Sequence, residues 1–250
     1  SITPVIVDPD VIKLFLDVNF KYDSSKTTKE RDTLVSNVKT TLTDFNNTNL
    51  KSFNLMFRHS EATALIDNTD AAILSNITNL NLAKSITPTL NTSSSFNIYF
   101  NNALYNPHSG HNASGGGILT STGFKVSGDA TNVQYFDEDG QGNVRRYYLI
   151  GITRNYTDNN AGTIDYATGA IVLNGITITS IEDVDGVAST SIRFTVVPNS
   201  KDIVPVRNQI LEIDFNNSKI SGEVDTIAVS QPGAGGTYTT SSSYTSPSTG

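Results

Sequence analysis

The stretch that most constrains the fold is IKLFLDVNFKY, residues 12–22, in which apolar and polar side chains alternate with only one interruption, at Phe15. A period of two places the two sets on opposite faces of an extended strand. The apolar face carries Ile12, Leu14, Leu16, Val18, Phe20 and Tyr22. The sequence therefore predicts a long strand with one face buried under a second layer.

The following segment, residues 28–46, is predicted to be that second layer. Thr27-Thr28-Lys29-Glu30 has the pattern of a capping box. Its threonines lower helix propensity by roughly 2–3 kcal/mol in total, whereas burial of four apolar side chains contributes roughly 6–12 kcal/mol. We therefore expect an amphipathic helix that is stable only when it packs on the strand. The four apolar residues at helical spacing are Leu34, Val38, Leu42 and Phe45.

A second helix is expected to start at a Ser60 cap and to run through Ala62, Leu65 and Ile66, and a strand follows around residues 72–83. Residues 1–89 would then form a two-layer strand–helix–helix–strand unit. The predicted fold class is α+β.

From Asn91 onward the helical period disappears, and short apolar runs of strand length alternate with turn residues. Residues 90–230 are therefore predicted to be a mostly antiparallel β domain, either a sandwich or an irregular barrel. The expected strands include segments near 96–100, 133–136, 147–152, 192–196, 210–215 and 227–229. Residues 231–250 form a Gly/Ser/Thr-rich C-terminal tail with almost no aliphatic side chains.

One hairpin is marked by its turn chemistry. Two short strands are predicted on either side of Ala167-Thr168-Gly169, where Gly169 can adopt a positive φ. Asp165 precedes the turn, where a short carboxylate bonds nearby backbone N–H groups. We interpret Asp165, Tyr166, Thr168 and Gly169 as hairpin residues and not as a catalytic group.

Composition excludes several classes of function. The chain has 17 basic and 24 acidic residues and a net charge of −7, which argues against phosphate-backbone binding by nucleic-acid proteins. It has no cysteine, which excludes disulfides and thiolate metal sites. No stretch approaches the roughly 18–20 apolar residues of a membrane span. The chain opens on Ser1 instead of Met, so we expect it to be a fragment or processed product of a longer protein.

Two loops contain metal-ligand residue types. His108 and His111 are three residues apart, but Pro107 and Gly110 forbid the helix that would present both to zinc. A third ligand such as Asp137 or Asp139 would have to come from elsewhere. Residues 137–143 (DEDGQGN) resemble the start of a calcium loop, yet position twelve is Tyr148, where a bidentate Glu is needed. We predict no metal site and no cofactor.

No catalytic constellation is evident. Ser114 lacks the strand–turn–helix setting of a nucleophile elbow. His59 precedes the second predicted helix and is expected to pack or cap. The acid pairs Asp137-Glu138 and Glu182-Asp183 suit solvated turns, although a hydrolase could in principle join Asp137 with Asp165 in one pocket. We predict that the chain is not an enzyme and has no small-molecule substrate.

Four stretches, in order and spacing, resemble a known family. They are PVIVDPDVIKLFLDVNFKYDSS, MFRHSEATALIDNTDAAILSNI, GTIDYATGAIVL and VVPNSKDIVPVRNQILEI. Together they are similar to the C-terminal part of the baseplate wedge protein (the product of gene six) of T-even-like contractile-tailed phages, a family related to the baseplate-J-like proteins.

The resemblance implies a structural subunit of the virion tail baseplate, assembled in the host cytoplasm. Its partners would be itself, as a homodimer or ring contact that joins neighbouring wedges around the hub, and other wedge subunits. Asp202, Pro205 and Arg207 are the candidate interface residues, since this segment is more polar than a plain strand needs. The alternative is a carbohydrate- or surface-binding β module of a tail fibre or adhesin.

Overall fold

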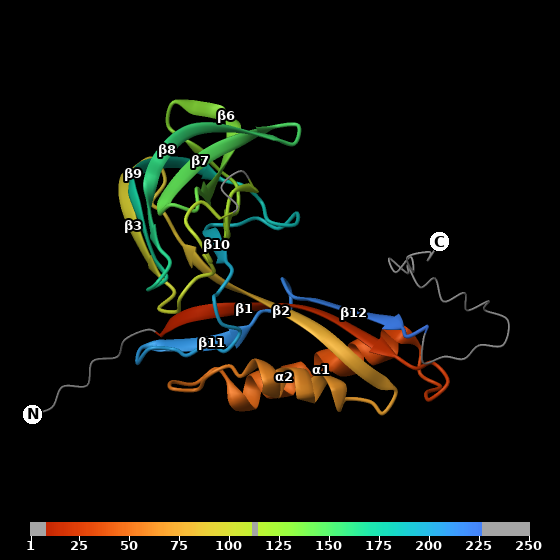
Figure 1. Cartoon of the computed structure of the whole chain (residues 1–250). Helices are drawn as coiled ribbons and strands as arrows, with labels where there is room; N and C mark the ends of the chain where they lie inside the picture. Colours follow the sequence, from red (N-terminus) through yellow and green to blue (C-terminus); the bar gives the residue numbers. More distant parts are fainter. Residues whose placement is uncertain (1–8, 112–114, 227–250) are drawn as a thin grey trace, which may run out of the picture.

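The computed structural model describes residues 9–111 and 115–226 (Figure 1). Ser114, the strand expected at 227–229 and the tail at 231–250 therefore lie outside the described residues. The described part is mostly β with two helices, which agrees with the predicted α+β class. Its elements are β1 (Asp10–Tyr22), α1 (Arg31–Asn49), α2 (His59–Asp67), β2 (Ile73–Ile86), β3 (Ser93–Tyr99), β4 (Leu119–Ser121), β5 (Phe124–Val126), β6 (Asp129–Glu138), β7 (Asn143–Ile150), β8 (Thr153–Asp165), β9 (Ala170–Ile181), β10 (Ile192–Val196), β11 (Gln209–Ile213) and β12 (Lys219–Val224).

The first sheet is built around β1 and has the order β11-β1-β2-β10-β4, with β12 also paired to β1. Strands β1 and β2 are antiparallel, whereas β11 and β12 run parallel to β1 and lie one after the other along the same edge. Both helices cover one face of this sheet, as Figure 1 shows. The order strand–helix–helix–strand is thus present, within a larger mixed sheet.

The expected division of strands needs correction. The segments at 192–196 and 210–215 were predicted in the β domain, but β10, β11 and β12 pair with β1 and β2 instead. Single strands carry no sequence mark of the sheet they join, because pairing partners are chosen by tertiary contacts.

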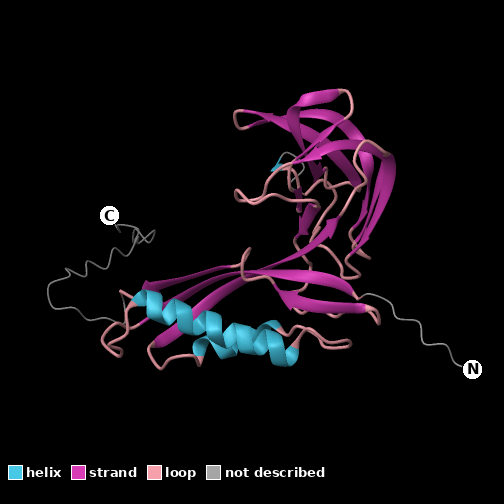
Figure 2. Cartoon of the chain, turned by 180° about the vertical axis from the view of Figure 1, so that it is seen from behind, coloured by secondary structure: helices cyan, strands magenta, loops and turns pink. Residues whose placement is uncertain are grey.

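The second sheet closes into an irregular barrel, the second of the two expected forms. Its order is β3-β9-β5-β6-β7-β8, and an additional pairing of β9 with β8 completes a ring of five strands, with β3 added outside on β9. Closure leaves no free edge within the ring itself. The barrel lies on the side of the first sheet opposite the helices (Figures 1 and 2).

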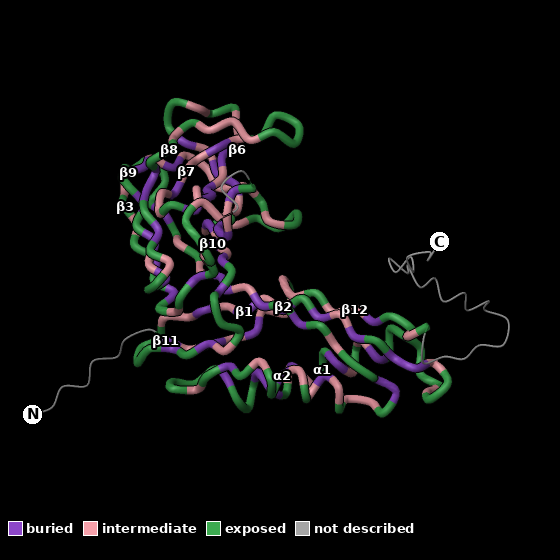
Figure 3. Tube along the Cα trace, in the orientation of Figure 1, coloured by how far each residue is buried: buried purple, intermediate pink, exposed green. Residues whose placement is uncertain are grey.

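Helix α1 packs as its spacing predicts, although its start differs. Its apolar stripe is fully or almost fully buried and belongs to the same buried cluster as the alternate side chains of β1 (Figure 3). The helix begins at Arg31 and has no side-chain cap, because the Thr27 hydroxyl accepts a hydrogen bond from the backbone of Lys29 at 3.1 Å. The predicted capping box is therefore wrong, and the helix ends at Asn49, three residues later than expected.

An aromatic stack joins the barrel to the first sheet. The ring centroids of Phe124 and Phe136 are 4.8 Å apart, and those of Phe136 and Phe194 are 5.6 Å apart. Phe124 and Phe136 belong to barrel strands, while Phe194 lies on β10 of the first sheet. The two sheets therefore share one hydrophobic core. Neither helix of the described residues is long and apolar enough to cross a membrane.

Leu42→Ala should lower the free energy of unfolding by about 2–5 kcal/mol, because Leu42 is fully buried between helix and sheet and a cavity remains after truncation. Urea unfolding followed by circular dichroism measures the change. Lys39→Ala on the exposed face of the same helix is the control and should change stability little. A loss below about half a kcal/mol for Leu42→Ala would contradict the packing.

Candidate assembly surface

The segment that links β10 to β11, residues 197–207, is held in place on both sides. The backbone of Tyr105 donates to the Val197 carbonyl at 3.0 Å, and Asn199 donates to Ala103 at 2.8 Å. Phe57 and Ile203 exchange two backbone hydrogen bonds, of 2.9 and 3.0 Å. The segment is thus an ordered part of the surface without being a strand.

The three candidate interface residues have different environments. The Asp202 carboxylate accepts hydrogen bonds from the backbone N–H of His59 and from the Arg58 guanidinium, each at 2.9 Å. It therefore occupies the start of α2, where we had expected a Ser60 cap. Pro205 is buried, whereas Arg207 is exposed and has no hydrogen bond or ion pair within the described residues.

These contacts change the titration of Asp202. The His59 N–H, and then the Arg58 guanidinium, lower the pKa of the Asp202 carboxyl from its ordinary value. A depressed carboxyl pKa means that the ionised form stabilises the folded chain at pH values above the ordinary pKa. Sequence reasoning missed this long-range cap because Asp202 and His59 are 143 residues apart.

Apolar side chains are exposed along the same segment. Val197, Val204 and Val206 are 37%, 51% and 44% exposed, and the neighbouring Tyr105 is 40% exposed. We call these four residues together with Arg207 the 197–207 surface. Single exposed apolar side chains are common, but a group held on one ordered segment is typical of a contact with another protein.

A second exposed apolar group lies at the tip of the β7–β8 hairpin. Leu149, Ile150 and Ile152 are 46%, 61% and 98% exposed, and Gly151 between them has a φ of 60°. The tip projects from the barrel in Figure 1. Three side chains at a hairpin tip offer much less contact area than a stable protein interface buries.

The hairpin at Asp165–Gly169 is formed by local hydrogen bonds. The Asp165 carboxylate accepts from the Thr168 hydroxyl at 2.7 Å and from the Ala167 N–H at 2.9 Å, and these contacts lower the pKa of Asp165. Gly169 has a φ of 72°, and a Cβ there would lie 2.4 Å from the Asn102 carbonyl oxygen. The Tyr166 hydroxyl points elsewhere, donating to the Glu138 carboxylate.

The acid pair Asp137-Glu138, expected in a solvated turn, is instead buried. Asp137 accepts from Arg145 Nε at 3.0 Å, from Arg154 Nη1 at 2.8 Å and from the Tyr156 hydroxyl at 2.8 Å. Burial raises the pKa of Asp137, against the opposing effects of the Tyr156 hydroxyl and the guanidinium groups. The expectation was wrong because both acids still belong to β6, and the turn begins only at the next residue and covers Asp139–Gly142.

Glu138 fixes three segments at once. Its carboxylate accepts from the Ile118 N–H at 2.8 Å, from the Gly140 N–H and from the Tyr166 hydroxyl. A Cβ on Gly117 would overlap the Glu138 carboxylate at 1.4 Å, so the glycine run is needed to cover the acid pair closely. That run was the available sequence signal for this cluster.

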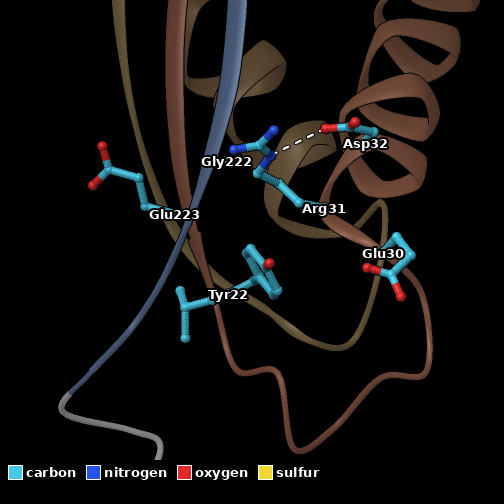
Figure 4. A pocket seen from close by; sticks show the side chains of 7 residues that line it. Tyr22, Glu30, Arg31, Asp32, Gly222 and Glu223 are labelled. Carbon is cyan, nitrogen blue, oxygen red and sulfur yellow. Dashed lines mark hydrogen bonds and ion pairs between the residues drawn. The ribbon is translucent and has the colours of Figure 1, made fainter.

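This geometry does not form a hydrolytic site. Arg145, Arg154 and Tyr156 hold the two oxygens of Asp137 inside the barrel wall, while Asp165 is exposed in its own turn. Neither acid lines the hollow between β12 and the start of α1 or the hollows beside β1, β2 and β11. The hollow in Figure 4 lies between β12 and the start of α1, where Arg31 pairs with Asp32 at 3.0 Å.

The structure places the histidines in two regions. His59 Nε2 lies 2.9 Å from the Thr78 carbonyl, whereas His108 and His111 contact each other. In the segment 137–143, Asp139 accepts from the backbone of Gln141 and Asn143 as a turn residue. Among the described residues, no group of three or more His, Cys, Asp or Glu side chains could hold a metal ion.

Comparison with known families decides the relationship of the first sheet. Residues 11–85 match the family model of the baseplate structural protein gp6, C-terminal domain III. Over these residues the chain is similar to that family. The match runs from β1 to the end of β2 and so coincides with the strand–helix–helix–strand unit. No curated protein matches the chain.

The match confirms the resemblance to a baseplate wedge protein and gives the chain a structural role in the phage baseplate. It covers the helix-bearing part of the first sheet, whereas the barrel and the 197–207 surface lie outside it. The contacts that the gp6-like chain makes through those parts are the subject of the proposals below.

Asp202→Ala should lower the free energy of unfolding by about 0.5–1 kcal/mol at pH 7, because it removes the carboxylate that caps α2. This value is in the lower part of the range for capping residues, since the Asp202 side chain is 39% exposed. The loss should shrink as the pH falls below about 3.9, since protonation removes the same contribution from the wild type. Urea unfolding at several pH values measures it. Asp183→Ala, at an exposed turn position, is the control.

Asp137→Ala should cost about 3 kcal/mol, because it removes the carboxylate that Arg145 and Arg154 share and so takes one counterion away from two partly buried guanidinium groups in the barrel wall. The value is at the low end of the range because the two guanidinium groups are 13% and 27% exposed. Thermal and urea unfolding measure it against Asp183→Ala. Equal stability of both variants would show that the cluster is not structural.

Proposed function

We propose that the chain is a structural subunit of a phage tail baseplate wedge and that it joins neighbouring wedges into a ring around the tail hub by self-association, without catalysis. The observation that carries the proposal is the gp6 C-terminal domain at residues 11–85. The wedge would belong to a contractile tail, be assembled in the host cytoplasm and include other wedge subunits as partners.

The 197–207 surface is the proposed self-contact. It combines three exposed valines and a tyrosine with Arg207, and apolar, aromatic and arginine side chains are all common at protein interfaces. Its position is fixed by backbone hydrogen bonds to residues 57 and 103–105, so little ordering entropy is lost on association. A two-fold contact would use the same patch on both copies, so that one substitution acts twice.

The absence of catalysis is supported by the state of the acid groups. Asp137 is fully buried and fully engaged, and Asp165 is confined to its turn. Nothing in the described residues favours the alternative of a carbohydrate- or surface-binding module, and the chain has no tryptophan to stack on a sugar.

Light scattering over a concentration series should show a dimer or higher oligomer of the wild-type chain by tens of micromolar. Val204→Asp/Val206→Asp should shift the apparent dissociation constant at least tenfold, because four charges per two-fold contact would be desolvated. Circular dichroism confirms that the variant is folded.

Two variants with the same chemistry locate the contact. Val187→Asp, at a 70% exposed turn valine, should leave association unchanged. Ile152→Asp tests the hairpin tip: if it alone disrupts the oligomer, self-association is real but the 197–207 surface is not its site. A strictly monomeric wild type at these concentrations would contradict self-association through this region.

A further inference from the structure

We propose that His108 and His111 form a two-histidine site for an exchangeable Zn²⁺ ion on the loop between β3 and β4. The inference is independent of the proposed baseplate role. It revises the expectation that the chain has no metal site, which rested on the absence of a helix at this position. The structure brings the two imidazoles together through a turn instead.

The distance between the two ring nitrogens suits a metal ion. His111 Nδ1 lies 3.2 Å from His108 Nε2. Two nitrogens on a tetrahedral zinc, each at about 2.0–2.1 Å, are roughly 3.3 Å apart. The ring centroids are 4.9 Å apart and the ring planes meet at 83°. Rotation of both rings away from their hydrogen-bonded arrangement would direct the two lone pairs at one ion.

The tautomer of His108 is set for ligation. His108 Nδ1 lies 3.2 Å from the Ser109 carbonyl oxygen, which can only accept a hydrogen bond. In the neutral imidazole the proton is then on Nδ1, and Nε2 carries the free lone pair. Zinc-binding histidines commonly donate their second ring N–H to a carbonyl in this way.

His111 has to change tautomer when the ion binds. Without metal, its Nδ1–H donates to His108 Nε2. With Zn²⁺ bound, the proton of His111 moves through solvent to Nε2, and Nδ1 becomes the second ligand. The neutral imidazole keeps one proton throughout, so the exchange of tautomers releases no net proton.

The loop that carries the pair is already held by the protein. The His111 N–H donates to the His108 carbonyl at 3.1 Å, and the Gly110 N–H donates to the Gly140 carbonyl at 2.8 Å. Gly110 has a φ of 76°, and the Tyr105 ring meets the His111 ring edge at 5.3 Å. Because these contacts do not involve a metal, folding should not depend on one.

Two protein ligands leave two coordination positions open to water. No third His, Cys, Asp or Glu joins the pair within the described residues. An all-imidazole pair favours borderline ions such as Zn²⁺ over Ca²⁺ or Mg²⁺, which prefer oxygen ligands. The site should therefore exchange zinc readily and release it to a chelator.

Titration with ZnCl₂ by isothermal calorimetry on the chelator-treated chain should show one site per chain. Co²⁺ should give the visible absorption of a low-coordinate nitrogen site. His108→Ala and His111→Ala should each weaken zinc binding at least tenfold, while His59→Asn, which removes the third histidine, should leave it unchanged. Calcium should not compete, and chelation should barely change the melting temperature.

Nitrogen-15 NMR of the histidine side chains is the decisive measurement. Zinc should shift His108 Nε2 and His111 Nδ1 and should move the His111 proton to Nε2. Binding through other nitrogens, binding retained in the His108→Ala/His111→Ala variant, or no zinc binding at all would each overturn the proposal. A large fall in melting temperature on chelation would also contradict it.

Discussion

The whole arrangement depends on β1 and its two edges. On one edge it pairs with β2, and on the other it pairs successively with β11 and β12, so that residues near 10–22 and 209–224 lie side by side. In the gap between β11 and β12 along this edge, the Ser218 hydroxyl accepts a hydrogen bond from the Leu16 N–H at 3.0 Å. The first sheet is therefore complete only when the last described strands have returned to the first.

This return makes the barrel an insertion within the first sheet. After β2 the chain enters the barrel at β3, returns to the first sheet at β4, builds β5 to β9 of the barrel and comes back at β10, which pairs with β2 and β4. The Phe136–Phe194 contact and the shared core fix the barrel against the sheet. Pairings so distant in sequence are slow to form, because the entropy of closing long loops is lost before their contacts are made.

The buried polar groups of the barrel also connect segments that are distant in sequence. Asp137 and Glu138 tie β6 to β7, β8, the glycine run and the Asp165–Gly169 hairpin by accepting hydrogen bonds from N–H and O–H donors of the protein itself. Buried acids are often signs of chemistry. Here they link segments of the barrel to one another, and the exposed apolar side chains include those of the 197–207 surface and the β7–β8 tip.

The sequence by itself determined the elements whose signal is local. The alternation of residues 12–22, the helical stripe of α1 and the turn chemistry at Asp165–Gly169 each depend on neighbours within a few residues, so they were readable without a structure. Only the tertiary structure decided what those elements meet. It assigned β10–β12 to the first sheet, brought Asp202 to the start of α2 and buried Asp137 among cations from two other strands. Such partners are 8 to 202 residues away in the chain, and no periodicity encodes them, because the free energy that selects them comes from packing and desolvation in the finished fold.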